Sequence, residues 1–163
     1  MPVDTYDRGA AVAYARKWAM ARNPAYYDFS QLGGDCTNFV SQCIYAGSGV
    51  MNYKPTFGWY YVSANNRSPS WTGVPYLYNF LVRKTGIGPS GVEAGMREMQ
   101  PGDISQFWDG SAYYHSQLIT SVGDPPSLGN ILVCTHTYDS IDKPLSAFDF
   151  KGIRFVHING AVK

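Results

Sequence analysis

The order in which helix-like and strand-like patterns follow one another is the feature that most constrains the fold of this chain. Residues 6–21, and the residues from about Cys36 to Ala46, repeat their apolar side chains at helical spacing. Strand-like segments follow in the second half of the chain: Asp103–Phe107, Ser116–Val122, Ile131–Thr137 and Ile153–Ile158. Helices first and then a run of strands predict an α+β domain with N-terminal helices packed on an antiparallel β-sheet. At 163 residues, the whole chain, 1–163, is expected to form a single domain.

Capping residues predict where these helices begin and end. Asp4 or Thr5 is expected as the N-cap of the first helix. Gly47 and Gly49 are expected to stop the second helix. A short third helix is predicted from Pro75 to Lys84, between aromatic segments that are rich in turn residues.

Charge and hydropathy exclude several classes of protein. The net charge is +1 and no run of like charges occurs, which argues against nucleic acid or an anionic membrane as a partner. No apolar run approaches the ~20 residues that span a bilayer, so membrane insertion is not expected. Residues 1–4 lack the basic and apolar regions of a signal peptide. The chain is therefore either a cytosolic protein or a domain of a longer exported protein.

The three cysteines leave at least one free thiol, because an odd number cannot pair completely. No C-x-x-C or H-E-x-x-H pattern occurs, so neither a metal nor another cofactor is expected. Cys43 lies on the apolar face of the second predicted helix, and Cys134 lies within a predicted strand. Both positions are typical of buried structural cysteines.

Cys36 differs from the other two cysteines, because it opens a helix directly after the glycine-rich turn SQLGGD. A helix N-terminus lowers the pKa of a thiol through its dipole and its free N–H groups. The same N–H groups can stabilise the oxyanion that forms on an attacked carbonyl. Position alone leaves two interpretations open for Cys36: a catalytic nucleophile or a structural cysteine.

A thiolate nucleophile needs a base, and the base needs an orienting partner. His115 opens one predicted strand, and His136 ends the next. If the two strands pair antiparallel, the start of the first lies beside the end of the second. We therefore expect His115 as the base and His136 as its orienting partner, with Asp139 as the alternative. His157 is expected to be structural. Each histidine taken singly is more often structural than catalytic, but a cysteine followed later by histidines favours catalysis.

Four further residues are candidates for contacts with a substrate. Asp35 could contact a substrate amine, although capping of the helix is the favoured role. The side-chain amide of Gln31 could complete an oxyanion hole. Trp59 and Trp71 lie in the aromatic segments and could form a substrate wall, with Trp71 expected to be the more exposed. The alternative for both tryptophans is packing in the core.

The segment GGDCTNFVSQCIYAG resembles the putative amidase domain family of Gram-positive bacteria, a branch of the papain-like amidases and peptidases. The resemblance covers nearly the whole chain in order. It includes YDRGAAVAYARKWAMARNPAYYDF before this segment, and GWYY, RSPSWTGVPYLYNFL, PGDISQ, HSQLIT, HTYDS and IRFVHING after it. It implies a papain-like fold in which Cys36 is the nucleophile and His115 is the base. His136 matches the third catalytic residue by position.

The resemblance also implies a function. Related domains usually act on cell-wall peptides as parts of exported multidomain proteins, so we expect an extracellular or wall-associated location within a longer parent. The expected activity is that of a cysteine amidase or endopeptidase that hydrolyses amide bonds of peptidoglycan peptides through a thioester acyl-enzyme. Two alternatives stay open: a catalytically silent wall-binding module with the same fold, and an acyl transferase that passes the acyl group to an amine.

Overall fold

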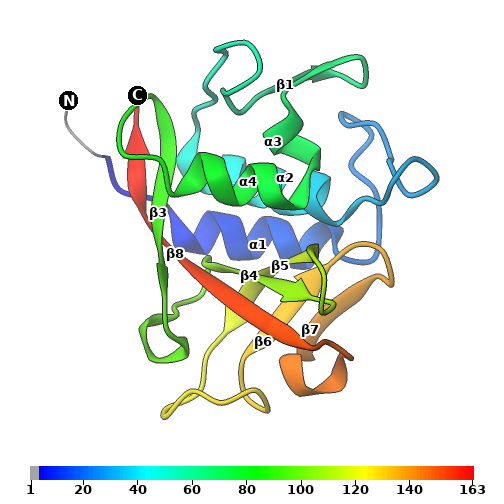
Figure 1. Ribbon diagram of the computed structural model, residues 1–163, viewed down its shortest axis with the longest axis vertical. Helices are drawn as coiled ribbons and strands as arrows, with labels where there is room; N and C mark the ends of the chain where they lie inside the picture. Colours follow the sequence, from blue (N-terminus) through cyan, green and yellow to red (C-terminus); the bar gives the residue numbers. More distant parts are fainter. Residues whose placement is uncertain (1–3) are drawn as a thin grey trace.

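The computed structural model describes residues 4–163 (Figure 1). Residues 1–3, on which the expectation of no signal peptide partly rests, lie outside the described residues. The elements follow in the order α1 (Arg8–Trp18), α2 (Cys36–Ser48), β1 (Tyr61–Ser63), β2 (Asn66–Arg67), α3 (Pro69–Thr72), α4 (Val74–Leu81), β3 (Gly88–Ala94), β4 (Ile104–Trp108), β5 (Tyr113–Ser121), β6 (Leu132–Thr135), β7 (Ser140–Pro144) and β8 (Gly152–Val162).

One six-stranded antiparallel sheet carries the second half of the chain, in the order β3-β8-β4-β5-β6-β7. Strands β1 and β2 pair separately. The helices α1, α2 and α4 lie over one face of the sheet (Figure 1), so the predicted α+β class and its layering are confirmed. The sequence missed β3, which contains two glycines and a proline, and β7, which ends in a proline. Within residues 4–163, no helix has the length and apolarity needed to cross a membrane.

Small residues bring α1 and α2 close together. Gly47 lies inside α2 rather than ending it. A Cβ atom at this position would collide with the ring of Tyr6, so glycine is needed here for close packing. On α1, small buried side chains recur at every fourth residue and continue just past its end. They are Ala11, Ala15 and Ala19, each with no exposed surface.

The caps of the two helices agree with the sequence only in part. Asp7 caps α1, since its side-chain oxygen accepts the N–H of Ala10 at 2.9 Å. The prediction of Asp4 or Thr5 for this position is therefore wrong. Helix α2 ends as predicted at Gly49, whose φ of 69° is the left-handed conformation that glycine adopts without strain.

The core between the helices and the sheet contains both tryptophans that were candidates for a substrate wall. Trp59 and Trp71 have no exposed surface, and their ring centroids lie 4.7 Å apart. The indole N–H of Trp59 donates to Ser41 Oγ at 3.1 Å, and that of Trp71 donates to Asn38 Oδ1 at 3.0 Å. The expectation of an exposed Trp71 is therefore wrong, because the turn residues around it belong to α3, which packs this ring inward.

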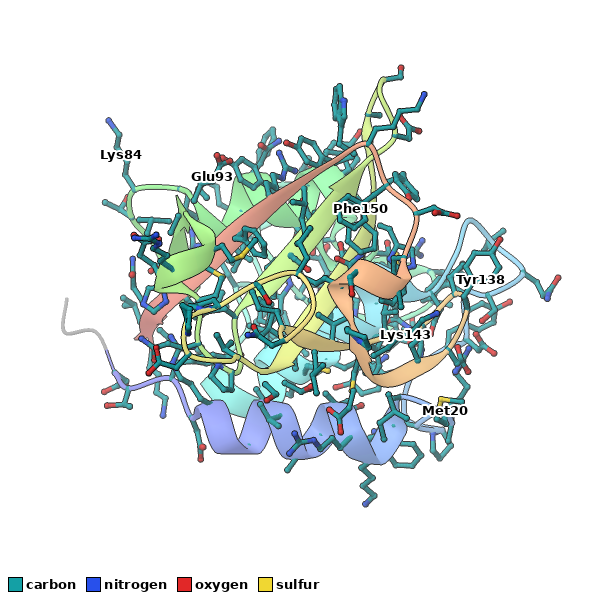
Figure 2. The ribbon with its side chains drawn as sticks, turned by 90° about the horizontal axis from the view of Figure 1, so that it is seen from below. Met20, Lys84, Glu93, Tyr138, Lys143 and Phe150 are labelled. Carbon is teal, nitrogen blue, oxygen red and sulfur yellow. The ribbon has the colours of Figure 1, made fainter. Side chains whose placement is uncertain are left out.

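A second apolar cluster covers the opposite face of the sheet. The segment from residue 145 to 150 and the loop between β5 and β6 lie over this face (Figure 2). The buried members of the cluster are Met99, Phe107, Ile119, Ile131, Val133, Leu145 and Phe155. The central strands are therefore buried on both faces, which places any functional side chain on them in a largely dry setting.

The two ends of the described chain lie side by side. Asp4 forms two backbone hydrogen bonds with Ala161 of β8, at 2.6 and 3.1 Å. The N–H of Asp7 donates to the carbonyl of Gly47 at 2.9 Å. Both ends therefore meet near the C-terminal end of α2 (Figure 1).

A buried carboxylate joins the start of α1 to two strands of the sheet. Asp103, just before β4, has no exposed surface. One oxygen accepts from Arg8 Nη1 at 2.8 Å and from the N–H of Ile158 at 2.9 Å. The other accepts from the N–H of Gln100 at 2.8 Å and lies 3.0 Å from Nδ1 of His157. His157 therefore makes the kind of contact expected of a structural histidine.

Replacing this carboxylate should destabilise the whole fold. Asp103→Asn leaves Arg8 without its counter-charge and turns an N–H₂ group toward several donors. We expect the free energy of unfolding to fall by about 3–5 kcal/mol, the usual cost of breaking a buried ion pair. Urea denaturation measures this loss. The control Asp149→Asn, at an exposed position, should stay within about 0.5 kcal/mol of the parent; equal losses in both variants would contradict the prediction.

Candidate active site

Cys36 is the first residue of α2, as predicted. All three cysteines are free, but 7% of the Cys36 surface remains exposed, whereas Cys43 and Cys134 have none. The N–H groups in the first turn of a helix have no partners within the helix, and they carry the positive end of its dipole. Cys36 is therefore the one cysteine that combines some access with a helix N-terminus.

Helix α2 begins beside the place where the backbone pairing between β5 and β6 ends. The backbone pairing of these strands ends before it reaches Ser116, and the carbonyl of Ser116 instead accepts the hydroxyl of Thr135 at 2.8 Å. The backbone N–H of Ser116 lies close enough to the sulfur of Cys36 to act on the pKa of its thiol. The hydroxyls of Ser116 and Thr37 lie 3.0 Å apart and join the strand to the helix. The sulfur therefore sits at the opening between the two strands.

Burial opposes ionisation of the Cys36 thiol. Desolvation raises the pKa of Cys36, while the N–H groups of Ser116 and Thr37 and the Thr37 hydroxyl, 3.8 Å from the sulfur, act in the opposite direction. The nearby Asp35 carboxylate adds to the rise. The lowered pKa that the sequence predicted is therefore wrong, because the start of α2 is buried against the sheet. Cys36 is a neutral thiol near pH 7 and depends on a base.

His115 lies on β5 directly before Ser116, on the sheet face away from α2. Side chains alternate along a strand, so Ser116 faces the helix while His115 and Gln117 face the other way. The His115 ring stacks on Phe107 with a centroid distance of 5.8 Å. Burial lowers the pKa of His115, so the ring is neutral near pH 7. Within the described residues, no hydrogen bond joins His115 to Cys36; the two are neighbours through the backbone of Ser116.

Two hydrogen bonds set the tautomer of His115. Its Nε2 lies 3.2 Å from the carbonyl oxygen of Thr137, which can only accept, so Nε2 carries the hydrogen. Nδ1 then holds the lone pair and accepts an amide N–H of Gln117 at 2.6 Å. The amide oxygen of Gln117 accepts the hydroxyl of Ser105 at 2.7 Å. The site therefore presents Nδ1 as the basic atom of His115.

The predicted antiparallel pairing of the two histidine strands is confirmed, but the side chain of His136 does not reach His115. Nδ1 of His136 lies 2.5 Å from Asp35 Oδ2, and Nε2 lies 2.8 Å from the carbonyl oxygen of Trp18. The Asp35 carboxylate accepts, so Nδ1 carries hydrogen. Nε2 faces both an acceptor, the carbonyl of Trp18, and a donor, Nη1 of Arg22 at 3.2 Å. The orienting contact that we expected from His136 is made by the carbonyl of Thr137.

Asp35 organises the turn before Cys36 rather than capping α2. One of its oxygens accepts the N–H of Phe29 at 2.8 Å and the side-chain amide of Asn38 at 2.9 Å, and the other pairs with His136. Its side chain makes no capping hydrogen bond to the backbone of α2. The favoured capping role is therefore wrong, and Asp35 instead fixes the position from which Cys36 starts the helix.

Asp139, the alternative orienting residue, pairs with Arg22. Its two oxygens lie 2.9 and 3.0 Å from the two Nη atoms of Arg22. Nε of Arg22 also lies 3.3 Å from Asp28 and 3.6 Å from Asp35. Arg22 thus gathers three carboxylates and joins the loop after α1 to the turns that precede α2 and follow β6.

The remaining candidates for substrate contacts do not gather around the sulfur. Gln31 is exposed in the turn before α2, and its side chain makes no hydrogen bond to a described residue. Trp59 and Trp71 lie in the core. A role for Gln31 in an oxyanion hole stays a prediction. Within residues 4–163, no group of three potential ligands from histidine, cysteine, aspartate and glutamate is placed to hold a metal ion.

A cavity of about 320 Å³ opens beside His115. Its wall combines aromatic rings with one charge of each sign. Tyr138, the most exposed of the rings at 86%, lies with Lys143 on the face of the sheet seen in Figure 2. The residues that line the cavity are Phe107, Tyr114, His115, Tyr138, Lys143, Ala147, Phe148 and Asp149. No sequence pattern predicts this wall, because its members come from four separate segments.

Sequence reasoning also missed Gln117, Thr137 and Arg22. Gln117 follows His115 by two positions on a strand, so the alternation of side chains puts both on the same face, and this signal was available. Thr137 acts through its carbonyl, which no side-chain pattern reveals. Arg22 and Asp139 are 117 residues apart in the sequence, so no local pattern reveals their contact.

The chain matches the putative amidase domain over residues 5–158 and belongs to that family. It is also similar to YhbB of Bacillus subtilis strain 168, a protein described as uncharacterized, with 36% identity over 140 residues. This match covers 83% of the chain but only 42% of YhbB, so the chain spans less than half the length of this relative. No solved structure matches the chain. The family's description suggests amide hydrolysis.

The tautomer of His115 is open to direct measurement. Long-range ¹H–¹⁵N NMR spectra near pH 7 should show hydrogen on Nε2 and none on Nδ1. The variant Gln117→Leu removes the N–H that Nδ1 accepts, so the pKa of His115 should rise. Gln100→Leu, at an exposed position, is the control and should leave it unchanged. Hydrogen on Nδ1 in the parent protein would contradict the hydrogen-bond assignment.

The pH dependence of thiol labelling tests the state of Cys36. Because burial raises its pKa, alkylation by iodoacetamide should be slow at neutral pH. The rate should keep rising above pH ~8.5, where an ordinary thiol ionises. Mass spectrometry of the modified peptide, with Cys36→Ser as the blank, reports the rate at this site alone. A rate that reaches its plateau below neutral pH would instead indicate a stable thiolate.

Proposed function

We propose that this chain is a cysteine-dependent hydrolase of amide bonds, with Cys36 as the nucleophile and His115 as the general base. The observation that carries the proposal is the position of Cys36 at the start of α2, where its sulfur meets Ser116, the strand neighbour of His115. Membership in the putative amidase domain family supports amide bonds as the target.

The neutral Cys36 thiol and the neutral His115 ring suit a reaction in which the proton moves from sulfur to imidazole during the attack. Nδ1 of His115 gives up the Gln117 hydrogen bond and takes the thiol proton while the sulfur of Cys36 attacks the amide carbonyl. The C–N bond breaks, His115 returns the proton to the leaving amine, and a thioester remains. Water then attacks the thioester with His115 again as the base, which yields a carboxylic acid and the free thiol. The imidazole turns toward the opening between β5 and β6 for these steps.

The oxyanion of the tetrahedral intermediate needs donors near the sulfur. The first-turn N–H groups of α2 and the N–H of Ser116 surround this position. Such fixed donors in a dry site stabilise developing negative charge strongly. They also explain how a buried thiol with a raised pKa can still be the nucleophile, since the stabilisation acts on the transition state rather than on the resting thiolate.

The cavity beside His115 supports a peptide as the substrate. Its aromatic wall suits an apolar side chain, Lys143 suits a carboxylate, and Asp149 suits an amine. Peptidoglycan stem peptides and cross-bridges carry groups of all three kinds, and they are the substrate class that we propose. The papain-like fold and an extracellular or wall-associated location within a longer exported protein belong to the same proposal.

A catalytically silent wall-binding module is the second candidate. Two observations favour it: the thiol has a raised pKa, and no hydrogen bond joins Cys36 to His115 within the described residues. In such a module, the cavity beside His115 holds a wall peptide without cutting it.

Defined muropeptides followed by mass spectrometry separate these candidates. The parent protein should release an amine and an acid, and Cys36→Ala should lose activity by roughly 10³-fold or more, as expected for a catalytic nucleophile. Cys43→Ala is the matched control, because it removes a buried thiol from the same helix and should stay active.

Three other outcomes of the muropeptide experiment distinguish the alternatives. Undiminished hydrolysis by Cys36→Ala contradicts the mechanism. Binding of muropeptides without cleavage by the parent protein supports the silent module. Products joined to an added amine indicate an acyl transferase.

A further inference from the structure

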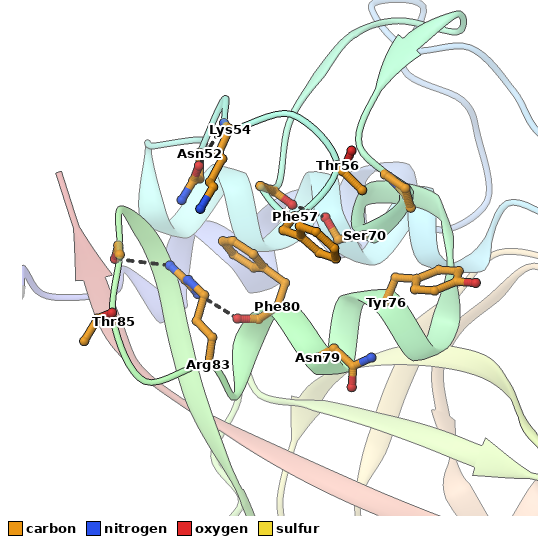
Figure 3. A pocket seen from close by; sticks show the side chains of 13 residues that line it. Asn52, Lys54, Thr56, Phe57, Ser70, Tyr76, Asn79, Phe80, Arg83 and Thr85 are labelled. Atoms are coloured by element: carbon orange, nitrogen blue, oxygen red, sulfur yellow. Dashed lines mark hydrogen bonds between the residues drawn. The ribbon is translucent and has the colours of Figure 1, made fainter.

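A second cavity, larger than the one beside His115, lies away from the candidate active site. It measures about 810 Å³ and opens between the loop from Asn52 to Gly58, the start of α3, the outer side of α4 and the turn that follows α4. Figure 3 shows it from close by. Neither Cys36 nor His115 lines it. This cavity is large enough for a group of peptide or drug size.

Aromatic rings form the body of this cavity. Phe57 and Tyr76 expose 79% and 56% of their surfaces, whereas Phe80 exposes only 4% and forms the floor. Large apolar side chains that are exposed and gathered around one hollow are typical of a binding surface. In Figure 3, Phe57 and Phe80 lie in the middle of the cavity and Tyr76 lies at one end.

Arg83 gives the other end of the cavity a positive charge. Its Nη1 donates to the carbonyls of Phe80 and Pro89, both at 2.7 Å, and its Nη2 donates to those of Gly86 and Ile87. All these partners are neutral carbonyls, and burial lowers the pKa of Arg83 to about 10. No carboxylate of the described residues forms an ion pair with it.

One donor of this guanidinium stays unused. Nε of Arg83 is buried and has no hydrogen-bond partner among the described residues, although a buried N–H normally has one. It lies close to Gly86, where a Cβ atom would come within 3.4 Å of it. Nε therefore lies under the turn at Gly86 with an unsatisfied N–H.

Lys54 adds a second cation at the same end (Figure 3). Lys54 is exposed and takes part in no ion pair with a described residue. Of the thirteen residues that line the cavity, all of them in the described part of the chain, none is acidic. The cavity thus has an aromatic body and an uncompensated cationic end.

We propose that this cavity binds the C-terminal residue of a peptide that ends in an aromatic or bulky aliphatic side chain. The side chain packs between Phe57, Tyr76 and Phe80, and the terminal carboxylate meets Lys54 and the positive charge of Arg83. An apolar body joined to a single anion complements both ends of the cavity at once. A free inorganic anion satisfies only the cationic end, and a neutral apolar group satisfies only the aromatic one.

The loop that carries Lys54 and Phe57 is built to hold this shape. Asn52 accepts the N–H of Lys54 at 3.0 Å through its side chain, and it pairs with Trp59 through two backbone hydrogen bonds at 2.8 and 2.7 Å. A Cβ atom at Gly58 would collide with the backbone of Asn52 and Lys54. The site is therefore largely preformed, which lowers the ordering cost of binding.

A matched pair of small probes tests the proposal. N-acetyl-phenylalanine carries the carboxylate, and N-acetyl-phenylalanine amide is its neutral twin. Titrations followed by ¹H–¹⁵N NMR should move the signals of Phe57, Phe80 and Arg83, with a Kd for the acid on the order of 1 mM, as expected for a ligand of this size. The amide should bind roughly threefold more weakly or worse, since it lacks the ion pairs.

Three variants separate the two ends of the cavity. Lys54→Ala should weaken binding of the acid by about two- to fivefold and leave the amide unchanged. Phe57→Ala, at an exposed position, should weaken both probes. Lys84→Ala is the control, because Lys84 is exposed beside Arg83 but does not line the cavity, and it should change neither.

Several results of these titrations would overturn the proposal. Equal affinity for acid and amide, signal changes that gather around His115, or no saturation at roughly ten times the expected Kd would each overturn the proposal. Inorganic phosphate that binds as tightly as the acid would also overturn it and reduce the site to an adventitious anion site. Binding that persists in Cys36→Ala keeps this site separate from the proposed hydrolase activity.

Discussion

The pair formed by Asp35 and His136 is the interaction on which the candidate site depends. The two side chains are 1% and 2% exposed, and their nearest atoms lie 2.5 Å apart. Buried polar groups are tolerated only when their other donors and acceptors are also satisfied, and Phe29, Asn38 and the carbonyl of Trp18 satisfy them here. Asp35 precedes α2 and His136 follows β6, so the pair holds the start of the helix against the end of the strand.

This arrangement assigns structural support and catalysis to different residues, whereas the sequence analysis placed Cys36, His115 and His136 together in one catalytic group. The polar groups Asp35, His136 and Arg22 hold the elements in place, while the reacting groups Cys36 and His115 stay neutral in dry surroundings. A low dielectric favours the neutral thiol and imidazole over the ion pair. Catalysis in such a site then relies on preorganised backbone donors rather than on a thiolate that exists at rest.

The sequence predicted the helices and strands that have strong local patterns. It did not predict which side chains are buried or which face of a strand they occupy. The helical periodicity from Cys36, the β5–β6 pairing and the structural role of His157 all rest on nearby residues, and the structure agrees with them. The interpretation of Trp71 failed because turn residues indicate a bend in the chain but not which side of it is covered. His136 follows the end of β6, and its side chain turns toward the loop before α2 while its backbone runs past His115. Strand adjacency gives no information on that direction. The two cavities draw on distant segments, so no window of sequence contains either one.

The bridge between Asp4 and Ala161 has a consequence for any larger architecture. It brings both ends of the described chain to the C-terminal end of α2, and Cys36 stands at the opposite end of that 13-residue helix, roughly 20 Å away at 1.5 Å per residue. Flanking segments joined at either end would leave from the same corner of the molecule. A tether attached there can hold the domain to a scaffold at the end of α2 that lies far from the thiol.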